Sequence, residues 1–112
     1  MNMKLLVFVL NQVDRLGAVL KKLEYANYSG ATVLDSRGMG VILSKYFGGS
    51  LLGSLYAMMD PDQDESRTVF MVLQEEEVPK VIALIEEEAG GFDEPNTGIA
   101  FTVPVDFVKG IL

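Results

Sequence analysis

The sequence contains no cysteine and no histidine, and its basic residues are few. These absences exclude a disulfide framework, zinc sites of the usual kind, thiol nucleophiles and histidine general bases. Nine basic residues stand against sixteen acidic ones, for a net charge of −7, and Lys and Arg form no stripe. Because phosphate binding along a nucleic acid needs clustered cations, we expect no nucleic-acid partner.

The length of 112 residues suits one domain, 1–112, and 49% hydrophobic residues predict a globular core. Residues 4–10 are too short for a signal peptide and lack a small-residue cleavage site, so we do not interpret them as one. The absence of cysteine fits a cytosolic setting. The carboxylates lie in charged runs, and no nucleophile is paired with a base. We therefore expect no enzymatic activity.

The first half of the chain has the pattern strand, helix, strand. Residues 4–10 (KLLVFVL) are a short apolar run typical of a buried strand. Asn11 is the expected N-cap of a helix, residues 27–30 (NYSG) end it, and residues 31–37 form the next strand. Apolar positions at three- and four-residue spacing predict the buried stripe of that helix: Val13, Leu16, Gly17, Leu20 and Leu23.

The second half repeats this pattern. Residues 67–74 predict a strand, the acidic run 75–77 with Pro79 predicts a helix start, Gly90 ends the helix, and residues 99–105 predict the last strand. The expected buried stripe is Val78, Val81, Ile82, Ile85 and Ala89. It aligns with the first half at an offset of 65 residues, as from Val13 to Val78, which indicates a duplicated unit.

Two such units predict an α+β, ferredoxin-like β-α-β-β-α-β fold, with both helices on one face of a four-stranded antiparallel sheet. The strands are apolar on both faces, so the face without helices also needs cover. We expect other copies of the chain to supply it. The pattern does not distinguish a trimer from a dimer, and we predict a homotrimer.

Residues 38–66 form a long connection between the second and third predicted strands. Within it, residues 41–59 are apolar with one charge, Lys45, and residues 60–65 (DPDQDE) are acidic. Two interpretations remain open: an arm that contacts a partner protein, and a β-hairpin that folds back on its own assembly. Three glycines and three serines oppose a membrane-spanning helix, so we do not expect the chain to span a membrane.

Three motifs resemble the nitrogen-regulatory PII family, over nearly the whole chain. Residues 30–40 (GATVLDSRGMG) are similar to the motif at the base of the family's T-loop. Residues 53–56 (GSLY) resemble the motif that carries its modifiable tyrosine, and Gly98 with Phe101 and Pro104 resembles the B-loop and last strand. The resemblance makes 38–66 a T-loop-like arm and 90–98 a B-loop-like segment.

The resemblance implies a cytoplasmic trimeric signalling protein that binds adenine nucleotide between subunits and regulates a target protein, often a membrane transporter, through its long loops. Residues 41–59 would contact that target. Tyr56 is the candidate site of modification. The implied cofactor-binding residues come from both motifs: Thr32, Arg37, Gly38, Met39 and Gly40 from the first, and Asn96, Thr97 and Gly98 from the second.

The sequence departs from the family at positions that carry cations. Four such positions are occupied by Val41, Ile99, Gly110 and Leu112, and Ile42 stands where the family has a glutamine. Because clustered cations supply most of the affinity for a triphosphate, weak triphosphate binding is expected. A less charged adenine nucleotide, another small metabolite and no ligand at all remain open, and the last of these makes the chain a ligand-free trimeric assembly module.

Overall fold

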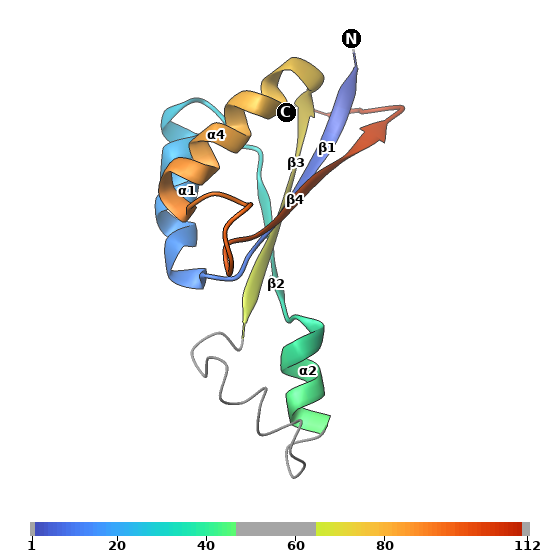
Figure 1. The fold of residues 1–112 in the computed structure, drawn as a ribbon. Coiled ribbons are helices and arrows are strands. Elements are labelled where there is room, and N and C mark those ends of the chain that lie inside the picture. Colours follow the sequence, from blue (N-terminus) through green and yellow to red (C-terminus); the bar gives the residue numbers. More distant parts are fainter. Residues whose placement is uncertain (1, 47–64, 111–112) are drawn as a thin grey trace.

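The computed structural model describes residues 2–46 and 65–110, which form one four-stranded sheet with helices against it (Figure 1). The strands are β1 (Met3–Leu10), β2 (Thr32–Ser36), β3 (Ser66–Gln74) and β4 (Gly98–Val105). The helices are α1 (Leu16–Tyr25), α2 (Met39–Tyr46) and α4 (Val78–Ala89). Short 3-10 helices, η1 (Val13–Arg15) and η2 (Glu75–Glu77), lead into α1 and α4.

The sheet has the order β2-β3-β1-β4, and every neighbouring pair is antiparallel. One row of paired residues crosses all four strands, from Asp35 through Arg67 and Leu10 to Gly98. Both long helices lie side by side on one face (Figure 1). The predicted ferredoxin-like α+β fold is confirmed.

The core lies between the sheet and the pair α1 and α4. Strand side chains alternate between the two faces, and the apolar residues of the central strands β1 and β3 that face the helices are almost fully buried. On β1 and β3 they are Leu6, Phe8, Leu10, Val69, Met71 and Leu73. The helices contribute Val19, Leu23, Val81, Ile85 and Ala89 to the same cluster.

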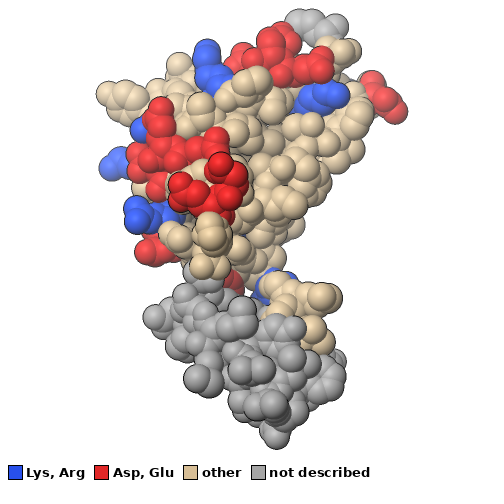
Figure 2. All heavy atoms as spheres, viewed as in Figure 1, with Lys and Arg blue, Asp and Glu red and all other residues tan. Residues whose placement is uncertain are grey.

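The opposite face of the sheet is apolar and is not covered by α1 or α4. Val7 pairs with Phe70 on β3 and with Phe101 on β4, so the three side chains share this face. The side chain of Phe101 is 47% exposed. Figure 2 shows Asp and Glu gathered over the helices and the turn before β4, whereas mostly uncharged residues follow the strands. Among residues 2–46 and 65–110, no helix packs on this apolar face (Figure 1).

The first helix differs from its prediction in two respects. Gln12, not Asn11, is the residue before η1, and it makes no side-chain capping bond. The stripe prediction was wrong at Gly17, which is exposed, and it omitted Val19, which is fully buried. Residue 17 lies two positions, about 200° around the helix, from Val19, so the two cannot share a side, and the larger side chain of Val19 faces the sheet.

The two halves of the chain therefore correspond at a different offset from the predicted one. Val19 matches Val81, and Leu23 matches Ile85, which gives an offset of 62 residues. The duplicated pattern is present, but the predicted offset of 65 was wrong. The predicted start of α4 is confirmed, since η2 contains the three glutamates and Pro79 lies in the first turn.

The connection after β2 begins as a helix. Residues 39–46 form α2, which extends away from the sheet below the end of β2 (Figure 1). The predicted arm 38–66 thus starts with two helical turns, which the sequence analysis did not anticipate. No helix in residues 2–46 and 65–110 is long and apolar enough to cross a membrane.

Candidate functional site

The base of the arm contains the first group of predicted binding residues. Arg37 and Gly38 are exposed between β2 and α2, and the side chain of Met39 is 76% exposed. The N–H of Ile42 donates to the carbonyl of Gly38 at 3.2 Å, which is the first hydrogen bond of the helix. The segment Gly38–Met39–Gly40 is therefore the entry to α2, and its backbone conformation is set by that helix.

Charges at the base of the arm largely neutralise one another. The guanidinium of Arg67 lies 3.2 Å from a carboxylate oxygen of Asp35 and 3.2 Å from one of Glu65. Arg37 is a second cation close by in the chain. Two arginines beside two carboxylates give this region little net positive charge.

A chain of hydroxyl groups lies next to these ion pairs. The hydroxyl of Thr68 donates to that of Ser36 at 2.9 Å, and the hydroxyls of Ser36 and Ser66 are 2.8 Å apart. The register of β2 and β3 places all three on the open face of the sheet. They bond to one another and join the two strands where the arm begins.

The second group of predicted residues lies in the turn before β4. Gly90 ends α4 with φ 92°, and the Phe92 N–H donates to a carboxylate oxygen of Glu86 at 2.8 Å. Asn96 is exposed with φ 68°, whereas Thr97 is only 3% exposed. The Thr97 carbonyl accepts a hydrogen bond from the Asn11 N–H at 3.1 Å, which extends the β1–β4 ladder by one pair. Asn11 therefore anchors this turn.

The two groups lie at the same end of the sheet but on opposite edges. Gly38 follows β2, Gly98 begins β4, and β3 and β1 run between them. Three strand spacings separate the edges, which amounts to about 14 Å. Thr32 is at the far end of β2, paired with Phe70. One chain therefore does not bring the predicted binding residues together around a single small ligand.

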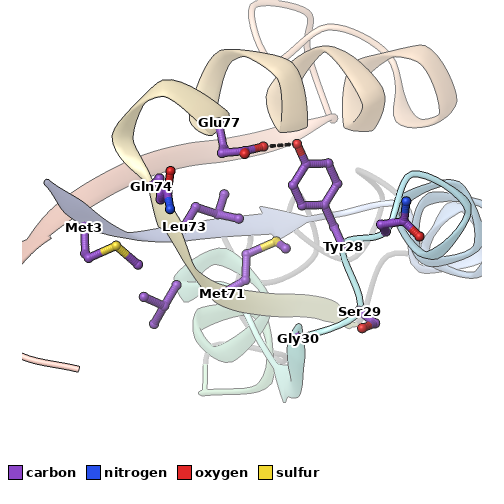
Figure 3. Close-up of a pocket in the computed structure, with 10 residues that line it drawn as sticks. Met3, Tyr28, Ser29, Gly30, Met71, Leu73, Gln74 and Glu77 are labelled. Atoms are coloured by element: carbon purple, nitrogen blue, oxygen red, sulfur yellow. Dashed lines mark hydrogen bonds between the residues drawn. The ribbon is translucent and has the colours of Figure 1, made fainter. Parts of the chain in front are cut away.

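A pocket lies away from both groups, at the opposite end of β3 (Figure 3). It has a volume of about 220 Å³ and lies between the loop after α1 and the end of β3. Its lining is Met3, Asn27, Tyr28, Ser29, Gly30, Met71, Val72, Leu73, Gln74 and Glu77. Sequence reasoning missed this pocket because it treated residues 27–30 only as a helix stop.

The C-terminal end of α1 fixes the position of the Tyr28 side chain in this pocket. The Tyr28 N–H donates to the Leu23 carbonyl at 2.8 Å, and the Asn27 N–H donates to the Glu24 carbonyl at 3.0 Å. With Asn27 at φ 70°, this is a Schellman motif. It directs the Tyr28 hydroxyl at Glu77, to which it donates a hydrogen bond (Figure 3). That bond to the carboxylate raises the pKa of Tyr28 to about 12.

Tyr56 and most of the apolar segment 41–59 lie outside the described residues. The predictions that Tyr56 is modified and that this segment contacts a target stay predictions.

Comparison with solved structures places the fold among known ones. A structure of PII from Arabidopsis thaliana bound to citrate matches with a TM-score of 0.62 and 22% identity, over 93% of this chain and 78% of that one. The fold of this chain resembles that of a PII protein. A protein of unknown function from Pediococcus pentosaceus matches with a TM-score of 0.66 and 19% identity, over 99% of both chains. No model of a known protein family matches the sequence, and no curated protein matches it.

Proposed function

We propose that this chain is a PII-like, non-enzymatic signalling protein that binds a small ligand between copies of itself and regulates a target protein. The observation that carries the proposal is the division of the binding residues between two edges of the sheet. Residues 37–40 follow one edge strand, and residues 96–98 precede the other. A ligand can touch both groups when the β2 edge of one copy faces the β4 edge of the next.

The open face of the sheet supports an assembly that brings these edges together. Its apolar side chains extend across all four strands, including Leu34, Val7 and Phe101. A patch of this kind is unusual on a monomer and is stable when other copies cover it. Because each copy offers the same sheet face and the same two edges, a closed homotrimer would contain three equivalent clefts.

The charge at the cleft favours a ligand less charged than a triphosphate. Arg67 is already paired with Asp35 and Glu65, and Ile99 follows the glycine that would approach a phosphate. An adenine nucleotide with one or two phosphates, or a small carboxylate, fits this balance better. The citrate bound to the PII protein of Arabidopsis thaliana makes a small carboxylate worth testing.

Ligand binding would be transmitted to the target protein by a change in the conformation of the arm. Gly38 directly precedes α2, and its carbonyl accepts the first hydrogen bond of that helix. A ligand at residues 37–40 would therefore change the free energy of the helix entry and shift the population of arm conformations. The apolar segment 41–59 then contacts a target protein, for which a membrane transporter at its cytoplasmic side is the first candidate.

Isothermal titration calorimetry of the purified assembly tests this function. The panel is ATP, ADP, AMP, cyclic adenine nucleotides, 2-oxoglutarate, citrate and bicarbonate, and limited proteolysis of the arm is measured with each. We expect micromolar binding of one ligand and a changed cleavage rate within residues 41–59. Binding without any change in the arm would contradict the signalling role.

An assembly module without ligand is the second candidate, and the missing cations with the open apolar face favour it. A stable homotrimer that binds none of the panel would support this second function against the first.

A further inference from the structure

Strand β3 is longer than the strand that pairs with its outer edge. The β2–β3 ladder ends where Thr32 pairs with Phe70, but β3 continues to Gln74. The Glu75 N–H donates to the Asn2 carbonyl at 2.9 Å, so odd-numbered residues of β3 direct their backbone groups at β1. Successive residues of a strand alternate in this direction. The backbone N–H and C=O groups of Val72 and Gln74 therefore point away from β1, past the end of β2.

These groups have no backbone partner within residues 2–46 and 65–110. The chain at residues 27–30 turns away from β3 instead of continuing the ladder, and this divergence opens the pocket (Figure 3). Two residues with free backbone donors and acceptors form a short unpaired sheet edge. Such an edge is able to pair with one further extended segment.

The pocket beside this edge accommodates about one side chain. Its volume of about 220 Å³ is below the roughly 300–1,000 Å³ of typical small-molecule sites. Met71 and Leu73 form part of its wall, and the hydroxyl of Tyr28 and the carboxylate of Glu77 lie at one side (Figure 3). An aliphatic stem with a polar head suits this lining.

The acidic residues around the pocket indicate that the polar head of the bound side chain is a cation. Tyr28 donates to one oxygen of Glu77, and no group in the described part of the chain donates to the second carboxylate oxygen, which can accept a bond. Glu75 and Glu76 precede it in η2. In an added antiparallel strand, the residue opposite Leu73 shares the face of Leu73, which is the helix side where Glu77 lies. A cationic side chain at that position would reach the carboxylate.

We propose that the free edge at Val72 and Gln74 binds an extended segment of a partner protein by strand addition, with a Lys or Arg side chain in the pocket against Glu77. This site is at the far end of β3 from the arm, so it does not depend on the ligand cleft proposed above.

A fluorescent peptide, acetyl-Thr-Val-Thr-Lys-Thr-Val-Thr-amide, tests the proposal by anisotropy with the full chain. The residue opposite Leu73 directs its own N–H to solvent, whereas its two neighbours direct theirs at β3. We expect N-methylation of the two threonines that flank the lysine to abolish binding. N-methylation of the lysine itself leaves the affinity within about twofold. Equal effects of the two modifications would overturn strand addition.

The charge contact is tested with Glu77→Gln, which keeps an acceptor for Tyr28 and removes the negative charge. We expect about a tenfold loss of affinity for the lysine peptide and little change for the same peptide with norleucine. Glu76→Gln is the matched control, because Glu76 is exposed in the same run and does not line the pocket. Equal losses for the two variants would contradict the pocket assignment.

Hydrogen exchange of the backbone amides locates the site independently. We expect the amides of Val72 and Gln74 to exchange fast in the free protein and to slow when the peptide is added. Slow exchange that already depends on protein concentration, without peptide, would show that a second copy occupies the edge, and the proposal would be wrong. No binding of any peptide would also overturn it.

Discussion

The backbone carbonyl of Val9 occupies the space that a side chain at residue 98 would need. A Cβ atom added to Gly98 would lie 1.7 Å from the Val9 oxygen, and φ at Gly98 is 136°. Both values restrict this position to glycine. The close approach lets β4 join β1 at its first residue, and it fixes how the turn 90–98 enters the sheet.

Gly98→Ala should therefore destabilise the protein by about 3 kcal/mol or more, since backbone strain is added to a steric clash. Gly17→Ala is the control, because Gly17 is exposed in α1 with nothing within 4 Å of an added Cβ. We expect it to stabilise by about 0.5 kcal/mol. Urea unfolding followed by circular dichroism measures both, and equal midpoints would refute the steric argument.

Tyr28→Phe should destabilise the protein by about 1 kcal/mol at neutral pH, because it removes a hydrogen bond to a carboxylate at a half-buried position. The pKa of Tyr28 is raised from 10.0 to about 12. Because the pKa is higher in the folded state than in the unfolded state, the hydrogen bond stabilises the folded protein fully below pH 10. This contribution is lost as the pH rises towards 12.

The stability difference between Tyr28→Phe and the parent protein should accordingly shrink between pH 10 and pH 12. Subtracting the ultraviolet titration of the variant from that of the parent isolates one of the four tyrosines. A difference curve with its midpoint at pH 10 would mean that the Tyr28–Glu77 hydrogen bond does not form in solution.

The strands and the layer arrangement could be predicted from the sequence because each strand carries a distinct apolar run. The predicted strand 4–10 matches β1 to within one residue, and 67–74 matches β3 to within one residue. The burial of α1 could not be predicted so well. Gly17 and Leu20 are three residues apart, and Val19 and Leu23 are four apart. Both spacings suit one side of a helix, so spacing alone does not decide which pair faces the sheet.

The candidate site also has one part that could be predicted from the sequence and one part that could not. The glycine at residue 98 could be recognised from its motif, since a close backbone contact leaves no alternative residue. The unpaired edge at Val72 and Gln74 could not, because it depends on how far β2 continues and not on the side chains of β3. The helical start of the arm was not predicted because Gly38 and Gly40 lie close together, and closely spaced glycines are typical of a turn.

Ile99→Lys should raise affinity for ATP more than affinity for AMP, if the turn 90–98 faces the ligand. The side chain of Ile99 is 57% exposed and directly follows Gly98, so a lysine there would be within reach of the phosphates. We expect about a tenfold gain for ATP, which corresponds to one charge-assisted contact. Thr102→Lys adds the same charge on the helix side of β4 and serves as the control. Equal effects of the two variants would indicate a general charge effect without a site.

Phe101→Glu should convert the assembly to monomers if the open sheet face is the contact between copies. Phe101 pairs with Val7 on that face, and a carboxylate buried there without a partner costs several kcal/mol per copy. The same residue is 47% exposed in the single chain, so the variant should still fold as a monomer. Thr102→Glu places the charge on the other side of β4 and should leave the assembly intact. Sedimentation velocity measures the mass of each variant. An assembly that survives Phe101→Glu would move the interface away from the sheet, and the proposed ligand clefts between β2 and β4 edges would then lack their support.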